Sequence, residues 1–98
     1  MNTKAASAAA LQEIFAKREG FRIQSNGDTT AVTHDGYPAR GAAFFPDSGG
    51  TMIKVVRHYF RQNIAYAVGT SSYATTRPEA LAMAMAWVEH GANYKGTD

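Results

Sequence analysis

The dipeptide Asn26-Gly27 lies between two segments in which apolar and polar residues alternate, and it constrains the fold more than any other feature. A type I′ turn needs positive φ at both central residues, and Asn-Gly is a strongly preferred pair for it. With Asn26-Gly27 as the loop, four side chains share one face in two facing pairs, Phe21 with Val32 and Ile23 with Thr30. The sequence therefore predicts an antiparallel hairpin.

A second turn is predicted at Asp35-Gly36, a further dipeptide of the hairpin type. This turn would place Tyr37 opposite His34 and Ala39 opposite Val32. Pro38 has no N–H to donate to a neighbouring strand, so we expect this third strand at an edge of the sheet. The segment from Pro46 to Gly50 is predicted to be a loop.

Residues 52–72 fit two structures. As strands, 52–60 and 64–72 form a hairpin around 61–63, and the abundance of Val, Ile, Tyr and Phe favours this interpretation. One face would then carry Val56, His58, Phe60, Ile64, Tyr66 and Val68. As a helix, the same segment has an apolar residue at every fourth position from Met52 to Val68.

An N-terminal helix is predicted over residues 5–18, which are rich in Ala, the best helix former. Its i, i+3, i+4, i+7 positions form one face, which we expect to pack on the core: Leu11, Ile14, Phe15 and Arg18. Gly20 is suited to the left-handed conformation that ends many helices.

A C-terminal helix is predicted over residues 77–90. Thr76 and Glu79 have the spacing of a capping box, and Pro78 is tolerated in the first turn. Gly91 is expected to end the helix.

These elements predict an α+β fold: an N-terminal helix, an antiparallel meander sheet of four to five strands, and a C-terminal helix packed on the sheet. The 98 residues suit one domain, with 1–4 and 93–98 expected to fray. The chain has no cysteine, which excludes disulfides and thiolate metal sites. No apolar run approaches the roughly 20 residues of a membrane span, so we expect a cytoplasmic protein and no membrane partner.

No motif of enzyme chemistry is present, and we expect no cofactor, no metal and no catalytic activity. His34, His58 and His90 lack partners at metal-ligand spacing. The segment 48–51 lacks the Lys of a phosphate-binding loop. An active site assembled from residues distant in the sequence stays open as an alternative.

The C-terminal helix carries nine consecutive residues without a polar side chain, 80–88. A core-facing stripe of Leu81, Ala84, Met85 and Val88 would leave Trp87 at the margin. The candidate partner-binding residues on the outer side are Ala82, Met83, Ala86 and Trp87. Three interpretations stay open: a solvated alanine face, a helix buried on both sides, or an interface with a second copy or another partner. Met and Trp are typical of binding surfaces.

The second candidate surface is basic and aromatic. Between Asp47 and Glu79 the chain has no acidic residue, although its net charge is only +2. On a strand, Arg57, Tyr59 and Arg61 alternate onto one face, suited to phosphates and to ring stacking. The candidate nucleic-acid or acidic-partner residues are Lys54, Arg57, Tyr59 and Arg61. The alternative is an ordinary solvated strand face.

Two resemblances follow from the order and style of the elements. The order helix, strands, helix resembles the double-stranded-RNA-binding domain in topology. Where that family has clustered lysines, at the start of the last helix, this chain reads Thr-Arg-Pro-Glu-Ala over 76–80. The short Thr-Thr-x-x-Glu-Ala helix start over 75–80 and the Ala/Met/Trp-rich final helix resemble small phage and mobile-element proteins of the anti-CRISPR type. That resemblance implies a protein that occludes a surface of a larger nucleoprotein machine.

The sequence thus favours a non-enzymatic binding protein, an inhibitor that docks on a larger protein or nucleoprotein complex. The alternative is a small nucleic-acid-binding module that uses the basic strand face.

Overall fold

The computed structural model describes the backbone of residues 3–91 and the side chains of residues 11–91. The elements follow in the order α1 (Thr3–Arg18), β1 (Phe21–Asn26), β2 (Thr29–His34), β3 (Arg40–Pro46), β4 (Ile53–Arg61), β5 (Ile64–Ala67), β6 (Ser72–Ala74) and α2 (Arg77–His90). Of the ends expected to fray, 1–2 and 93–98 lie outside the described residues, whereas 3–4 begin α1.

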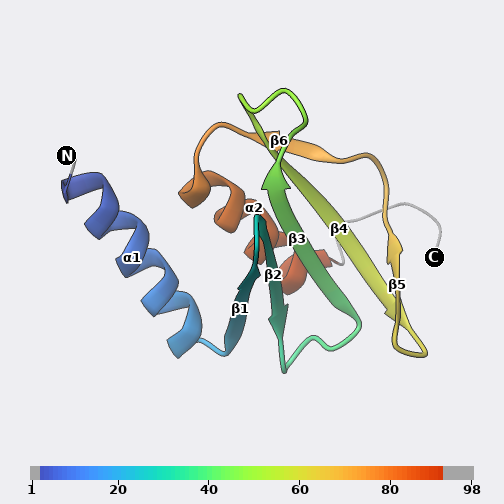
Figure 1. Ribbon diagram of the computed structural model, residues 1–98. Coiled ribbons are helices and arrows are strands. Elements are labelled where there is room, and N and C mark those ends of the chain that lie inside the picture. The colour runs from blue at the N-terminus through green and yellow to red at the C-terminus, as the bar shows by residue number, and fades with distance from the viewer. Residues whose placement is uncertain (1–2, 92–98) are drawn as a thin grey trace.

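The strands form one antiparallel sheet in the order β1-β2-β3-β4-β5 (Figure 1). β5 pairs with one end of β4 and β6 pairs with the other end. The α+β fold with a helix packed on an antiparallel sheet is therefore confirmed. The sheet has six strands because the predicted strand 64–72 is divided into β5 and β6.

The β1–β2 hairpin forms with the predicted faces but in a different register. Phe21 lies opposite His34, and Ile23 lies opposite Val32, so the loop is Gly27-Asp28. Only Gly27 has positive φ, the pattern of a type II′ turn, which places Gly first. The register differs by two residues, and a shift of two keeps every side chain on its face. Phe21, Thr30 and Val32 are accordingly buried.

A turn forms at Asp35-Gly36 as predicted, but it does not join two strands directly, so the two-residue hairpin and the edge strand that followed from it are wrong. The Nδ1 atom of His34 accepts a hydrogen bond from the Gly36 N–H at 2.8 Å, and the carbonyl of His34 accepts one from Tyr37 N–H at 3.1 Å. These contacts build a five-residue connection over 35–39. Pro38 lies in this connection, and β3 pairs on both sides, with β2 and β4.

Residues 53–61 and 64–67 form strands, so the helical alternative for this segment is wrong. The loop is Gln62-Asn63, with φ of 53° and 66°, which is the type I′ pattern. The loop is one residue shorter than predicted, so Tyr59 lies opposite Tyr66. This reassigns the two predicted faces at β5: Ile64 and Tyr66 share a face with Tyr59, not with Phe60.

The core lies between α2 and one face of the sheet, which we call the α2 side (Figure 1). No helix of residues 3–91 crosses the opposite face, which we call the open face. The largest fully buried side chains come from both layers: Val32 and Val55 from the sheet, Leu81 and Val88 from α2.

Both ends of α2 are fixed by side chains. Thr76 accepts a hydrogen bond from the Glu79 N–H at 3.3 Å, as predicted, while the Glu79 carboxylate accepts from the Thr75 hydroxyl. At the other end, Arg40 donates to the carbonyls of Val88 and Glu89. Cations near helix C-termini are stabilising because the last carbonyls lack partners.

Glycine suits position 91, directly after α2, because a larger residue would collide with a neighbouring side chain. Its φ is −53°, so it does not take the left-handed conformation that was expected. A Cβ at this position would lie 2.0 Å from Cδ of Arg40. The glycine therefore leaves room for the arginine that caps the helix.

The helix α1 packs on the body in an unexpected orientation. The predicted core-facing residues Leu11, Ile14 and Phe15 are 52%, 47% and 57% exposed, and Ala16 is buried in their place. The prediction that this stripe packs on the core is wrong. Gln12 and Glu13 face the body and make polar contacts with the start of α2.

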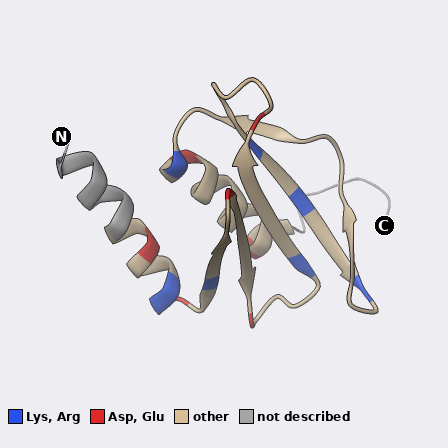
Figure 2. Ribbon diagram, in the orientation of Figure 1, with Lys and Arg blue, Asp and Glu red and all other residues tan. Residues whose placement is uncertain are grey.

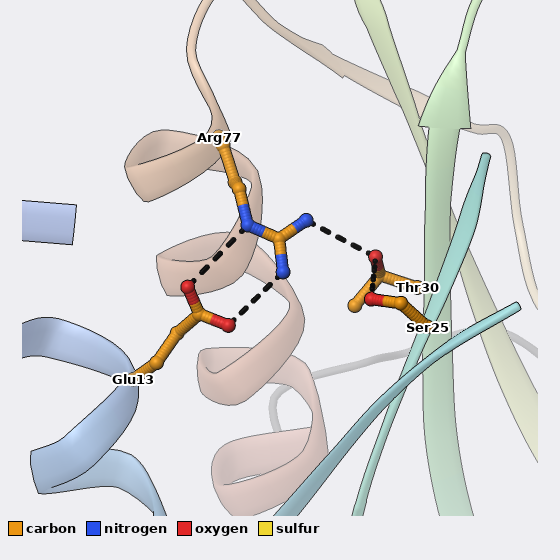
Figure 3. Close-up of polar contacts among 4 residues, drawn as sticks. All are labelled: Glu13, Ser25, Thr30 and Arg77. Atoms are coloured by element: carbon orange, nitrogen blue, oxygen red, sulfur yellow. Dashed lines mark hydrogen bonds and ion pairs between the residues drawn. The ribbon is translucent and has the colours of Figure 1, made fainter. Parts of the chain in front are cut away.

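These contacts centre on Arg77 (Figure 3). Its guanidinium forms an ion pair with Glu13 at 3.0 Å and donates to the Thr30 hydroxyl at 3.1 Å. Thr30 in turn lies 2.9 Å from the Ser25 hydroxyl. One arginine thus joins α1, α2 and the first hairpin.

Candidate partner-binding surface

The strands carry basic residues and no acidic ones. Within residues 3–91, every Asp and Glu lies in a helix, a turn or a loop, as Figure 2 shows. The cationic side chains of the strands are Arg22, Arg40, Lys54, Arg57 and Arg61. The acid-free stretch seen in the sequence is therefore part of a sheet whose strands carry no acidic residue and whose cations lie on β1, β3 and β4.

Two of these cations lie on the α2 side of β4. Val55 is buried under α2, and the alternation of a strand places Arg57, Tyr59 and Arg61 on the same side. The three residues predicted to share a face do so. The guanidinium of Arg61 lies 6.0 Å from the centre of the Tyr59 ring. Lys54, predicted to belong to the same surface, lies on the open face and is not part of it.

A hollow of about 650 Å³ separates β4 from the outer half of α2. Its walls come from β4, the β5–β6 connection and α2: Arg57, Gly69, Thr70, Met83, Ala86, Trp87 and His90. The two surfaces that the sequence presented separately therefore meet here, because Arg57 and Met83 line one hollow.

Arg57 is held in place by the β5–β6 connection. Its guanidinium donates to the Thr70 carbonyl at 2.9 Å and to the Ser72 hydroxyl. A guanidinium has five N–H donors in a fixed planar arrangement. These two contacts orient the cation while leaving it only partly buried, as a binding residue requires.

The outer residues of α2 differ in how far they are exposed to solvent. Ala82 and Ala86 are exposed, and Met83 is half-buried at the hollow. Trp87 is only 8% exposed, and its indole N–H donates to the carbonyls of Gly41 and His58. Trp87 is therefore a core residue that forms the floor of the hollow. The sequence suggested that Trp87 is an exposed contact on the outer side of α2, whereas its side chain is almost completely buried.

Two members of this surface were not predicted from the sequence. Ile64 and Tyr66 are each about half exposed and continue the α2 side beyond Arg61 and Tyr59, their partners in β4. The sequence feature that determines their side is the length of the turn. Because the loop is the two residues Gln62-Asn63, Ile64 lies opposite Arg61 and Tyr66 lies opposite Tyr59. We call the combined surface the α2–β4 face; it comprises Arg57, Tyr59, Arg61, Ile64, Tyr66, Met83, Ala86 and His90.

A second hollow, of about 270 Å³, lies between α1 and α2. Ala82 and Ala86 lie on its α2 wall, and Gln12 lies on its α1 wall. The exposed alanines therefore form a low ridge between the two hollows, so the outer side of α2 is flanked by concave surface on both sides.

The histidines show no arrangement for metal binding. Among the described residues no three His, Asp or Glu side chains are placed to hold a metal ion. His34 accepts from Gly36 N–H through Nδ1, so its proton lies on Nε2 and is donated to the Glu19 carbonyl at 2.8 Å. His58 lies on the open face, where burial lowers its pKa below the usual 6.5.

In the part of the chain that the structure describes, no helix is long and apolar enough to span a bilayer. A comparison of the whole chain with protein-family models, curated proteins and solved structures finds no match.

Proposed function

We propose that this chain is a non-enzymatic binding protein whose α2–β4 face docks on an acidic surface of a larger protein or nucleoprotein complex. One observation carries the proposal: a single hollow joins the apolar side of α2 at Met83 to the oriented cation of Arg57. Tyr, Met and Arg are the residues enriched at the centres of protein interfaces.

The charges favour an acidic partner. Arg57 and Arg61 lie on a strand without acidic residues, and the hollow contains no carboxylate. Complementary charge speeds association and selects the partner. The style-level resemblance to anti-CRISPR proteins fits this mode of action, since such an inhibitor blocks a surface and needs no chemistry of its own. The inhibitory role and the phage or mobile-element origin belong to the proposal.

The test uses a photo-crosslinking amino acid in place of Met83, in the host cell. We expect a discrete crosslinked partner that is lost in the Arg57→Glu and Arg61→Glu variants. The matched control is Arg18→Glu, which makes the same charge change on an exposed residue of α1. A crosslink that persists in both α2–β4 variants, or that disappears equally in the control, contradicts the proposal.

Nucleic-acid binding is the second candidate, favoured by Arg57, Tyr59 and Arg61 on one side of β4. Fluorescence anisotropy with labelled single-stranded and duplex DNA and RNA tests it at two salt concentrations. If the partner is a nucleic acid, the double variant Arg57→Glu/Arg61→Glu should weaken binding to every sequence and reduce the salt slope by about 2. An unchanged slope removes this candidate.

A further inference from the structure

The open face of the sheet differs between its two halves. On β1 the side chains that point to this face are polar, namely Arg22, Gln24 and Asn26. A sheet with one solvated face shows this alternation of apolar and polar residues. On β3 and β4 the alternation is lost, because the residues that point away from α2 are mostly apolar as well. A strand that is apolar on both faces is typical of a sheet covered on both faces.

The apolar half forms a contiguous patch over β3, β4 and β6. We call it the open-face patch; it comprises Ala43, Phe45, Val56, His58, Phe60 and Tyr73. The strand register places Ala43 beside Val56, and Phe45 and Tyr73 on either side of Lys54. The Phe60 ring lies over Gly41, where a Cβ would approach it to 2.5 Å, so the glycine leaves room for this ring.

The size of the patch suits the centre of an interface. Neighbouring strands are about 4.8 Å apart and each residue rises about 3.3 Å, so β3, β4 and β6 together cover roughly 300 Å², and the whole sheet roughly 550 Å², before side-chain relief is counted. A stable interface buries about 800 Å² on each partner, with an apolar centre and a polar rim. Thr33 on β2 and Arg22 on β1 lie beyond the patch and supply such a rim, and Lys54 lies at one end of the patch between Phe45 and Tyr73.

The charges of the open face favour a second copy over a nucleic acid. No strand carries an acidic residue, and the cations of this face are Lys54 and Arg22, of which Arg22 is paired with Asp35 at 3.0 Å. One unpaired cation gives little attraction for phosphates. Apart from His58, and Lys54 at one end, the open-face patch is apolar, and an apolar surface is complementary to itself, which a two-fold symmetric contact requires.

We propose that two copies of this chain associate through their open-face patches, with the two sheets stacked face to face. Stacked sheets lie about 10 Å apart, with side chains interdigitating between them. The two α2–β4 faces then point outward in opposite directions, so the dimer presents its binding surface twice. This inference does not depend on the proposed function of that face.

The proposed dimer would increase the burial of His58. Its pKa is already lowered in the single chain by desolvation. Its neighbours across the strands are Gly41 and Ala67, and Lys54 is the nearest charged residue along β4 on the same face. A second sheet placed over this imidazole would disfavour its charged form further.

The experiment measures the mass of the full chain by sedimentation velocity from micromolar to near-millimolar concentration. We expect a dimer whose dissociation constant rises by about 100-fold or more in Val56→Lys, because two like charges would face each other across the symmetry axis. The control Ala82→Lys places the same charge on an exposed position of α2 and should leave the dimer unchanged. Circular dichroism verifies the fold of each variant.

A second measurement keeps the test decisive if Val56→Lys fails to fold. The chain has no cysteine, so one introduced thiol is unique. A short bis-maleimide should join two copies of Val56→Cys and should not join two copies of Ala82→Cys. The proposal is overturned if the native chain is a monomer throughout, if folded Val56→Lys remains a dimer, or if only Ala82→Cys is crosslinked.

Discussion

The two helices of this protein are held by opposite means. α2 buries Ala80, Leu81, Ala84, Trp87 and Val88 against the sheet, and its two ends are capped. Among the described side chains of α1 only Ala16 is fully buried, and polar contacts of Gln12 and Glu13 join the helix to the body. An apolar stripe therefore indicates that a helix forms, but not which of its sides meets the core.

The largest expected effect comes from a matched pair of leucines. Leu81 in α2 is 1% exposed and Leu11 in α1 is 52% exposed. Leu81→Ala removes buried methyl groups and leaves a cavity, which should cost about 2–5 kcal/mol of unfolding free energy. Leu11→Ala should cost less than about 1 kcal/mol. Urea denaturation measures both, and equal losses would show that the stripe of α1 is covered in solution.

The next effect concerns the hydrogen bonds under α2. Trp87→Phe keeps an aromatic ring but removes the indole N–H, leaving the carbonyls of Gly41 and His58 without this donor. A buried acceptor that loses its partner costs about 1–3 kcal/mol. Thermal unfolding should record this loss. A variant as stable as the native chain would mean that the indole contributes only its volume.

A smaller effect is expected when the contact that attaches α1 to the rest of the protein is removed. Arg77→Met removes the ion pair with Glu13 and the bond to Thr30 while keeping an unbranched side chain. Because Arg77 is partly exposed and solvent screens the pair, the global cost should be about 1 kcal/mol. Hydrogen exchange should nevertheless show α1 amides losing protection while those of α2 keep theirs. Glu13→Gln weakens the same ion pair from the α1 side and should have the same local effect, and a uniform loss over both helices would contradict the separate attachment of α1.

The smallest expected effect is a pH dependence of the free energy of unfolding, caused by His58 in β4. The pKa of His58 is lower in the folded chain than its ordinary 6.5, so the unfolded chain binds the proton more readily. The contribution of His58 to stability is fully present above pH 6.5 and falls as the pH drops toward the folded pKa. His58→Asn should remove this part of the slope, measured as the difference between the two unfolding curves from pH 7 to 5. Identical slopes would contradict it.

Local rules in the sequence were enough for much of the fold. The Thr76 cap, the α2 bounds and the faces of the first hairpin depend on residues close in the chain, and all three were predicted. The length of the connection after β2 was not, because the chain makes a further turn after Asp35-Gly36 before β3 begins at Arg40. The orientation of α1 also escaped prediction, since Arg77 lies more than sixty residues from Glu13.

The sequence predicted the β4 part and the α2 part of the candidate surface separately. Alternation along β4 placed Arg57, Tyr59 and Arg61 together, and the helical period placed Met83 and Ala86 on the outer side of α2. That the halves meet depends on how α2 crosses the sheet, which no local pattern encodes. The burial of Trp87 was equally hidden, because a helix without polar residues over 80–88 gives no mark of its solvent side.

Trp87 has one more consequence, which concerns light rather than binding. It is the chain's only tryptophan, and it forms the floor of the hollow between β4 and α2. Its fluorescence therefore reports on this one place in the molecule. Separation of α2 from the sheet would shift the emission to longer wavelength, and a partner segment entering the hollow would change its intensity. The protein thus carries its own spectroscopic label at the surface proposed to bind.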